Sequence, residues 1–196
     1  MKAQDLYNYI YSHAIPNKAL YGAWGKRDGY FVRYIRQNVP KSAKILDASC
    51  GRGFLLRWLI ADGYDAEGTE IADWLMKPGG DLYGLPVSEL AYEELHSIPA
   101  DCYDVVISND VIEHLASLDA AKEAVGNLAR ISKRWVLIST GGEKAAACPF
   151  RIELGVSNLH NVIAPYEIWK SIYENFCELD EEYHAAGSRI FLGCKL

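Results

Sequence analysis

The chain has 196 residues, of which 50% are hydrophobic and 23% are charged, and its formal net charge is −6. A chain of this length fits one domain and can build its own core, since roughly 70% of the unfolded surface is buried at this size. The acidic balance disfavours a nucleic-acid partner, because proteins that bind a phosphate backbone usually present a basic stripe.

Membrane and secretion signals are missing from the sequence. No stretch holds the ~18 consecutive apolar residues that a membrane span needs, and no apolar run follows a basic start. The five cysteines lie far apart without a CxxC pair, which favours reduced thiols over disulfides or a zinc site. We expect one cytoplasmic domain over residues 1–196, and the sequence leaves its oligomeric state open.

Residues 1–43 are rich in aromatic side chains. The spacing of Phe31, Tyr34 and Ile35 predicts a helix over about 26–37 that Pro40 ends. Upstream, Tyr21 and Trp24 are flanked by glycines. These two side chains either pack on the core or belong to a flap over a ligand, and the second interpretation makes them substrate-binding residues.

Residues 44–53 read KILDASCGRG, an apolar strand that turns sharply into a helix. Gly51 and Gly53 lack a Cβ atom, so the turn can take a positive φ and a ligand can lie against the backbone. This pattern indicates a nucleotide-like ligand. The alternative is structural, because any strand-to-helix turn in an α/β protein can use glycine.

The remaining elements alternate between strands and helices. Apolar runs and alternation predict strands near residues 64–70, 85–90, 103–108, 135–139, 176–179 and 189–194. Helical spacing predicts helices after the glycine turn, over about 118–131, and from Pro165 onward with Ile168, Trp169, Ile172 and Phe176 inward. The order predicts an α/β fold with a mostly parallel sheet. The irregular segment 141–165 is long enough to suggest a functional loop.

The chain resembles class I S-adenosylmethionine-dependent methyltransferases over about residues 40–140. DASCGRG is similar to the family's D-x-G-C-G-x-G loop, GTEIA to the acidic end of its second strand, and YDVVISNDVIEHL to its fourth-strand segment. The resemblance implies a Rossmann-like, doubly wound, mostly parallel seven-stranded sheet with a C-terminal antiparallel hairpin. Residues 44–140 would form the cofactor-binding core, 1–43 a helical flap and 141–165 the acceptor-site loop.

The resemblance also implies positions for the cofactor, S-adenosyl-L-methionine. Its amino-acid end and ribose would lie against the glycine turn, Glu70 would accept hydrogen bonds from both ribose hydroxyls, and Ile71 would lie against the adenine. The residues implied by position are Asp47, Ser49, Gly51, Gly53, Glu70, Ile71 and Asn109. Ser49 departs from the family, which has glycine there, so we expect less room at that position. A further adenine contact would come from the region of Glu89 and Tyr92.

A nicotinamide-dependent dehydrogenase is the rival for a glycine turn of this kind. Such enzymes use G-x-G-x-x-G, whose third glycine allows close packing of helix on strand. Gly51 and Gly53 are followed here by Phe54, Leu55 and Leu56. The missing glycine favours the methyltransferase.

Asp110, Glu113 and His114 follow a buried strand at spacings that would place them on one face of a helix. In one interpretation Glu113 and His114 only brace that helix. In another, His114 or Asp110 removes the proton from an oxygen or nitrogen acceptor, and His160 of the later loop lines the acceptor pocket. In a third, Asp110, Glu113, His114 and His160 hold a divalent metal, as the resemblance of D-x-x-E-H to metal-dependent O-methyltransferases implies.

The leading hypothesis from the sequence is therefore an enzyme that transfers a methyl group to an oxygen or nitrogen atom of a small molecule without a metal. The short chain leaves little room for a segment that reads protein or nucleic acid. The alternative from another class is a cofactor-binding or interaction protein that keeps the fold without turnover, because fold does not guarantee function.

Overall fold

The computed structural model describes residues 1–14, 24–185 and 187–196. Seven strands form one sheet in the order β3-β2-β1-β4-β5-β7-β6. Their bounds are β1 Lys44–Ala48, β2 Asp65–Glu70, β3 Val87–Glu89, β4 Tyr103–Asn109, β5 Ser132–Thr140, β6 Cys177–Ala185 and β7 Ser188–Lys195. The first five pair in parallel, whereas β7 runs antiparallel to both β5 and β6. The predicted Rossmann-like sheet with a terminal antiparallel hairpin is confirmed.

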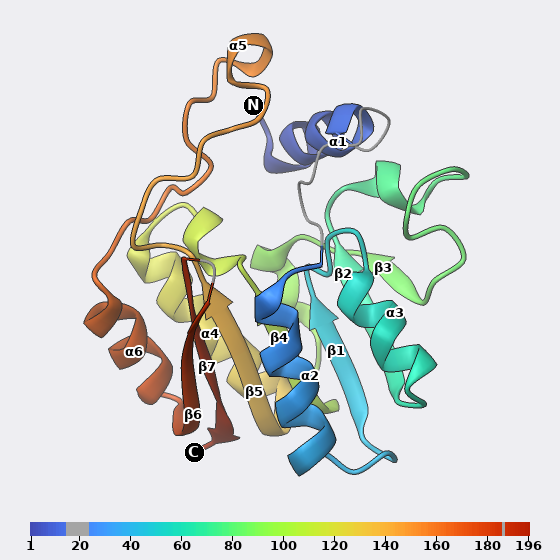
Figure 1. The fold of residues 1–196 in the computed structure, drawn as a ribbon, viewed down its shortest axis with the longest axis vertical. Coiled ribbons are helices and arrows are strands. Elements are labelled where there is room, and N and C mark those ends of the chain that lie inside the picture. Colours follow the sequence, from blue (N-terminus) through green and yellow to red (C-terminus); the bar gives the residue numbers. More distant parts are fainter. Residues whose placement is uncertain (15–23, 186) are drawn as a thin grey trace.

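Helices cover both faces of this sheet (Figure 1). The α-helices are α1 Ala3–Ala14, α2 Lys26–Asn38, α3 Phe54–Ala61, α4 Leu118–Ile131, α5 Arg151–Leu154 and α6 Tyr166–Glu174. Short 3-10 helices follow three of the strands: η1 Asp73–Met76, η2 Tyr92–Ser97 and η3 Ile112–His114. One core forms between the sheet and α2 and α3, and a second between the sheet and α4 and α6.

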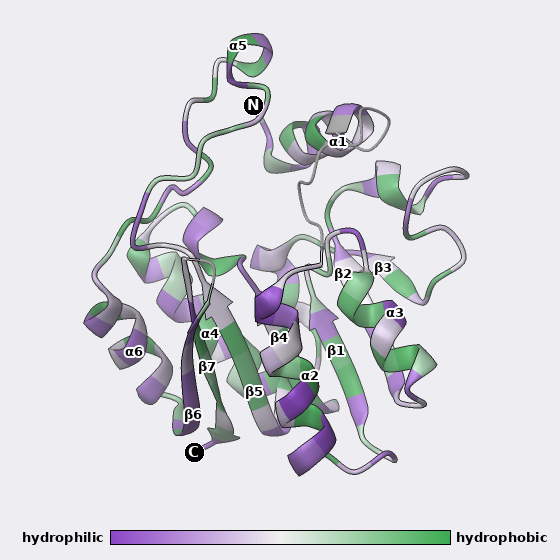
Figure 2. Ribbon diagram, in the orientation of Figure 1, coloured by the Kyte–Doolittle hydropathy of each residue, from purple (hydrophilic) through white to green (hydrophobic). Residues whose placement is uncertain are grey.

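Sequence pattern explains which strands lie at the centre. In β4, Val105, Val106 and Ile107 are fully buried between the two helical layers. Figure 2 shows the central strands as predominantly hydrophobic, whereas the edge strand β6 carries hydrophilic residues along its length. Such continuous apolar runs are typical of parallel strands that are covered on both faces.

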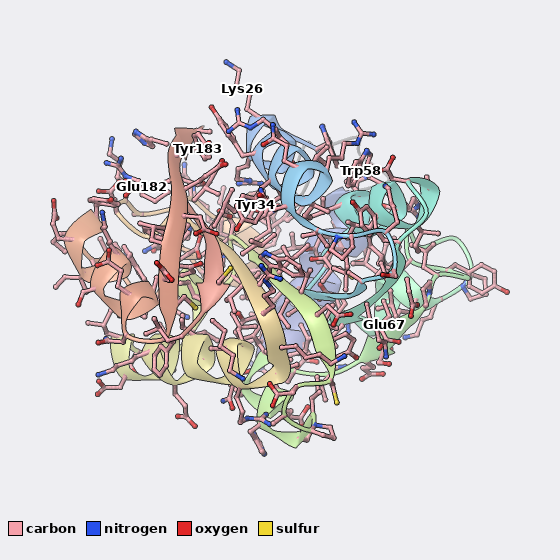
Figure 3. The ribbon with its side chains drawn as sticks, turned by 90° about the horizontal axis from the view of Figure 1, so that it is seen from below. Lys26, Tyr34, Trp58, Glu67, Glu182 and Tyr183 are labelled. Carbon is pink, nitrogen blue, oxygen red and sulfur yellow. The ribbon has the colours of Figure 1, made fainter. Side chains whose placement is uncertain are left out.

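Helix α2 is docked on the C-terminal hairpin, as the view from below shows (Figure 3). The hydroxyl of Tyr34 donates to the carboxylate of Asp180 at 2.5 Å, and the ring of Tyr30 stacks on that of Tyr183 at 4.3 Å. Burial and the nearby Asp180 charge raise the pKa of Tyr34, so its hydroxyl stays a donor. The helix predicted over 26–37 is confirmed.

One predicted face is wrong in part. Ile168 was expected inward, but it is 40% exposed, while Trp169, Ile172 and Tyr173 are buried. Residues 169, 172 and 173 have the i, i+3, i+4 spacing of one helical face, and Ile168 lies beside it. Phe176 lies beyond the end of α6 and faces Gly126 of α4, where a Cβ atom would come within 3.1 Å of its ring.

Across the described ranges, no helix combines the length and the apolar character that crossing a bilayer requires.

Candidate active site

The strand-to-helix turn after β1 has the backbone that glycine favours. Ser49, Gly51 and Gly53 have φ values of 62°, 54° and 71°. Ser49 therefore adopts a left-handed conformation that costs a residue with a Cβ atom about 1 kcal/mol or more. Its amide donates to the hydroxyl of Thr69 at 3.1 Å, which ties the turn to the end of β2. The serine keeps the geometry that the glycine pattern predicts.

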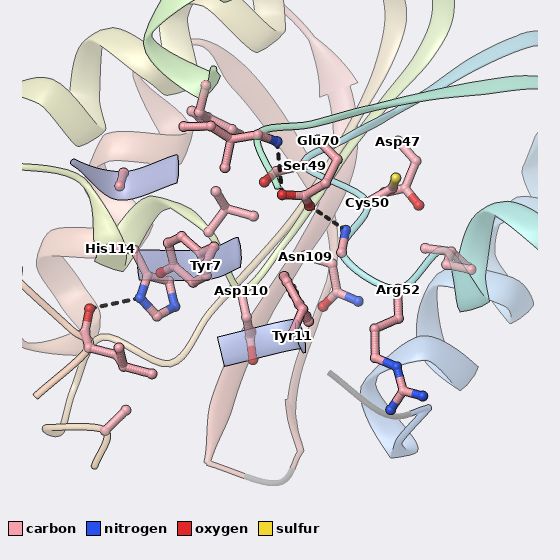
Figure 4. A pocket seen from close by; sticks show the side chains of 18 of the residues that line it. Tyr7, Tyr11, Asp47, Ser49, Cys50, Arg52, Glu70, Asn109, Asp110 and His114 are labelled. Atoms are coloured by element: carbon pink, nitrogen blue, oxygen red, sulfur yellow. Dashed lines mark hydrogen bonds between the residues drawn. The ribbon is translucent and has the colours of Figure 1, made fainter. Parts of the chain in front are cut away.

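Glu70 ends β2 beside this turn and is only 3% exposed. Its carboxylate accepts hydrogen bonds from the amides of Gly51, Ile71 and Ala72 at 2.9, 2.8 and 2.9 Å, two of which are drawn in Figure 4. A carboxylate has about four acceptor positions, so about one remains, on the oxygen that faces Gly51. Burial raises the pKa of Glu70, and these three amides oppose that rise.

Asp47, at the end of β1, is buried close to other acids. Burial raises its pKa to about 7, and the negative charges of Asp28 and Glu70 add to the rise. This concentration of carboxylates in one wall favours a ligand that carries positive charge.

A cavity of about 480 Å³ opens at the carboxyl ends of β1, β2 and β4, where the strand order reverses. It falls within the usual size of small-molecule sites. The predicted site residues that line it are Trp24, Asp47, Ser49, Gly51, Glu70, Ile71, Asn109, Asp110, His114 and His160. Gly53 does not line it, but its φ of 71° favours glycine, and a Cβ atom there would lie 2.5 Å from a methyl group of Leu82, which would have to move. Of the two further adenine candidates, Tyr92 lines the cavity and Glu89 does not.

The helix α1 supplies cavity residues that the sequence reasoning missed. Tyr7 and Tyr11 line the cavity, and the ring of Tyr7 stands edge-on to that of His114 at 6.1 Å. Asn8 fixes the helix, because its side chain donates to Asp73 and accepts from the amide of Trp74. The spacing of Leu6, Tyr7, Ile10 and Tyr11 could have indicated this helix. Tyr21 of the expected flap lies outside the described residues, and Trp24 is 44% exposed.

The expected helical face of Asp110, Glu113 and His114 is wrong. Asp110 has a φ of 54°, and its amide donates to the carbonyl of Ser139 at 3.1 Å. The chain then makes only the short helix η3, and α4 begins afresh at the cap residue Ser117. The left-handed residue therefore breaks the periodicity that the sequence suggested.

Both oxygens of the Asp110 carboxylate have partners outside the Glu113 and His114 segment. It pairs with the guanidinium of Arg27 from α2 and accepts hydrogen bonds from the hydroxyls of Ser139 and Ser188. Asn109, the preceding residue, donates to Asp28, and its side-chain oxygen shares the single hydroxyl hydrogen of Ser139 with Asp110. These contacts fasten α2 to the end of β4, and they separate Asp110 from the metal-ligand set in which the sequence placed it.

Glu113, His114 and His160 do come together. Their possible ligand atoms all lie within 4.8 Å of one another. The rings of His114 and His160 meet edge-on at 5.0 Å, and the segment carrying His160 is fixed by the Asn161 side chain, which donates to the carbonyl of His114 at 2.7 Å. Burial lowers the pKa of His114, so its ring is neutral near pH 7. Burial and the charge of Asp110 raise the pKa of Glu113 to about 8.

The structure resembles methyltransferases of known structure. Over all of both chains it is similar to magnesium protoporphyrin IX methyltransferase of Synechocystis PCC 6803, solved with bound S-adenosylhomocysteine, at a TM-score of 0.69 and 17% identity. It is also similar to the 1,6-didemethyltoxoflavin-N1-methyltransferase of Burkholderia thailandensis, at a TM-score of 0.70 and 12% identity, covering 100% of this chain and 91% of that one. A third similar structure is a Haloferax volcanii complex of a methyltransferase with its Trm112 activator, at a TM-score of 0.66, 13% identity and coverages of 96% and 97%.

Sequence comparison assigns the family. No curated protein matches the chain significantly. A family model described as a methyltransferase domain matches residues 23–158, which is more than half of the chain. That range includes the glycine turn, Glu70 and the segment from β4 to His114. The chain therefore belongs to the class I S-adenosylmethionine-dependent methyltransferases, whose methyl donor is S-adenosylmethionine.

Proposed function

We propose that this protein is an active methyltransferase that transfers the methyl group of S-adenosylmethionine to an oxygen or nitrogen atom of a small-molecule acceptor. One observation carries the proposal: a single cavity joins the glycine turn and Glu70 at one end to the imidazoles of His114 and His160 at the other. Donor and acceptor can therefore meet inside one cavity, which is what a direct transfer requires.

The cofactor end fits the chemistry of S-adenosylmethionine. The cofactor carries a positive sulfonium and amino group, and the wall formed by Asp47, Asp28 and Glu70 concentrates negative charge. Glu70 keeps about one acceptor position for a ribose hydroxyl, fewer than the two hydrogen bonds that the family resemblance implied. Ile71 and Asn109 would complete this end of the site.

The acceptor end fits proton removal. S-adenosylmethionine supplies an activated methyl group, so the protein mainly aligns the acceptor and receives its proton. His114 holds its Nδ1 atom against the carbonyl of Leu159 at 2.8 Å, which leaves Nε2 as the basic atom. We assign proton acceptance to His114 rather than to Asp110, whose oxygens bind Arg27, Ser139 and Ser188. His160, Trp24 and the loop 141–165 would position the acceptor.

A small acceptor agrees with the volume of the cavity and with the α1 helix above it. Two structural neighbours are named for small molecules, magnesium protoporphyrin IX and 1,6-didemethyltoxoflavin. The rival hypothesis of an inactive binding protein rested on Ser49, and the left-handed backbone of Ser49 supports a working turn instead.

Calorimetry with S-adenosylmethionine and S-adenosylhomocysteine tests the proposal. We expect both to bind with a dissociation constant below roughly 1 mM, which corresponds to about 4 kcal/mol of binding free energy. Absence of binding by either ligand would refute the cofactor assignment. Formation of S-adenosylhomocysteine with a panel of hydroxylated and aminated small molecules then separates an enzyme from a protein that only binds.

A further inference from the structure

Glu113 has a buried oxygen without a partner. The residue is fully buried, and its Oε1 atom accepts a hydrogen bond from the amide of Gly141 at 2.7 Å. Its Oε2 atom has no partner at hydrogen-bonding geometry in the part of the chain that the structure describes, although the Thr140 hydroxyl is near enough to lower the pKa of Glu113. An ionised carboxylate would leave a buried charge there, and a protonated one would leave a buried O–H without an acceptor. Native proteins rarely leave such an atom unsatisfied, so a ligand is indicated in either protonation state.

Two imidazoles next to Glu113 present free ring nitrogens. The Nδ1 atom of His114 contacts the carbonyl of Leu159 at 2.8 Å, and that of His160 contacts the carbonyl of Lys144 at 2.6 Å. Because a carbonyl only accepts, each Nδ1 carries the hydrogen and each Nε2 offers a lone pair. Metal-binding histidines are typically held in this way, with the second nitrogen bonded to a backbone carbonyl.

We propose that Glu113, His114 and His160 form a binding site for a divalent first-row transition ion. Two imidazole nitrogens and one carboxylate suit zinc, cobalt and similar ions better than magnesium or calcium, which prefer oxygen ligands alone. The ligand atoms lie within 4.8 Å of one another, and the Nε2 atom of His160 lies 3.9 Å from Oε1 of Glu113. Metal–ligand distances near 2.1 Å need these atoms to draw in by roughly 1 Å, which side-chain rotation can supply.

The surrounding backbone holds this set in place. The amide of Val162 donates to the carbonyl of Glu113 at 3.0 Å, and the Asn161 side chain donates to that of His114 at 2.7 Å. Gly141 has no Cβ atom, and one added there would lie 3.1 Å from the His160 ring and 3.2 Å from Oε1 of Glu113. Residues 161 and 162, which follow His160, are therefore hydrogen-bonded directly to the backbone of Glu113 and His114.

The site faces the acceptor end of the cavity, since His114 and His160 line it and Glu113 lies behind them. This inference rests on the proposed function for its role: a cation there would make the hydroxyl of an acceptor more acidic, which favours oxygen acceptors. With a cation bound, the Nε2 atom of His114 would be a ligand, and the acidified hydroxyl would lose its proton to water at the open side of the cavity. In the metal-free chain the same Nε2 atom is the proton acceptor proposed above.

Cobalt(II) is the probe for this site, because its visible absorption reports the ligands. The purified chain is freed of metal with a chelator, dialysed and titrated with Co²⁺. We expect one equivalent to bind with visible bands, and we expect Glu113→Gln and His160→Ala to bind at least about tenfold more weakly. His96→Ala is the matched control, because His96 is exposed and also contacts a backbone carbonyl, that of Glu93 at 2.8 Å.

Thermal unfolding of the wild-type chain with Zn²⁺ gives a second readout that does not need the variants to fold. A ligand of the native state raises the melting temperature as its concentration rises. Absence of saturable Co²⁺ binding up to about 1 mM, unchanged affinity in Glu113→Gln, or an equal loss in His96→Ala would overturn the site. Intense near-ultraviolet thiolate bands would also overturn it, by placing the ion on cysteines.

Calorimetry in metal-free buffer keeps the two proposals apart. Binding of S-adenosylmethionine without binding of Co²⁺ would refute the metal site alone. Binding of Co²⁺ without binding of either cofactor form would refute the proposed function and leave the metal site standing.

Discussion

Replacing Glu70 by alanine removes the acceptor of three backbone amides at once, those of Gly51, Ile71 and Ala72. A hydrogen bond to a charged group contributes about 1.5–3 kcal/mol net. The sum for three bonds is an upper bound, because burial already disfavours the charged carboxylate and the amide of Gly51 lies at the cavity, where water can replace the lost acceptor. We therefore expect Glu70→Ala to lower the free energy of unfolding by on the order of 2–4 kcal/mol.

The same substitution should weaken S-adenosylmethionine binding by about 1.5–3 kcal/mol, the range for losing a hydrogen bond to a charged acceptor. Urea denaturation measures the first effect and calorimetry on the folded variant the second. Glu89→Ala is the matched control: Glu89 lies opposite Glu70 in the register of β2 and β3, but it is exposed and accepts only from the Gln4 side chain among the contacts described. It should change stability by less than about 0.5 kcal/mol.

Two results would refute this reasoning. If Glu70→Ala is as stable as Glu89→Ala, the three amides do not depend on the carboxylate. If it folds normally and binds S-adenosylmethionine with wild-type affinity, Glu70 is not part of the cofactor site.

Three further predictions test other parts of the site. Between the ordinary pKa of 3.8 and the folded value of about 7, Asp47 is protonated more often in the native state than in the unfolded state, so the free energy of unfolding falls as the pH rises through this window. Urea denaturation at several pH values should show a smaller fall for Asp47→Asn than for the wild type. Parallel curves would contradict the raised pKa. Ser49→Val should be about 1–2 kcal/mol less stable than Ser49→Gly by thermal unfolding, because a β-branched residue fits a φ of 62° poorly. Equal stabilities would mean that the backbone of the turn changes its conformation at no cost. His114→Ala should lower turnover while calorimetry shows unchanged S-adenosylmethionine affinity, and wild-type turnover would return His114 to a structural role; His96→Ala serves as its control.

Local sequence was sufficient for the elements and for the cofactor turn. Buried parallel strands need continuous apolar runs, so the run around Val105 predicts its strand directly. The turn after β1 needs positive φ values close to a ligand, which is why Gly51 and Gly53 mark it. The acid at the end of the second strand follows from parallel pairing, because a compact strand–helix–strand unit places both strand ends at one edge.

The chemistry at the acceptor end was decided by tertiary structure. Asp110 and Glu113 are equivalent as carboxylates in the sequence, yet one is neutralised by Arg27 from α2 and the other is buried beside His160. The amide of Asp110 donates to the carbonyl of Ser139 in β5, and the backbone of Asp110 is left-handed there. The side chains of Asp110 and Glu113 therefore point toward different partners.

The sequence by itself therefore determined the fold class and the position of the cofactor turn, because strand burial and left-handed turns are encoded in neighbouring residues. Only the tertiary structure decided that Tyr7 and Tyr11 of α1 line the cavity and that His160 reaches Glu113 and His114. These contacts join residues far apart in the chain. They depend on two carbonyl groups of the loop 141–165, those of Leu159 and Lys144, which orient the rings of His114 and His160. No local periodicity carries that information.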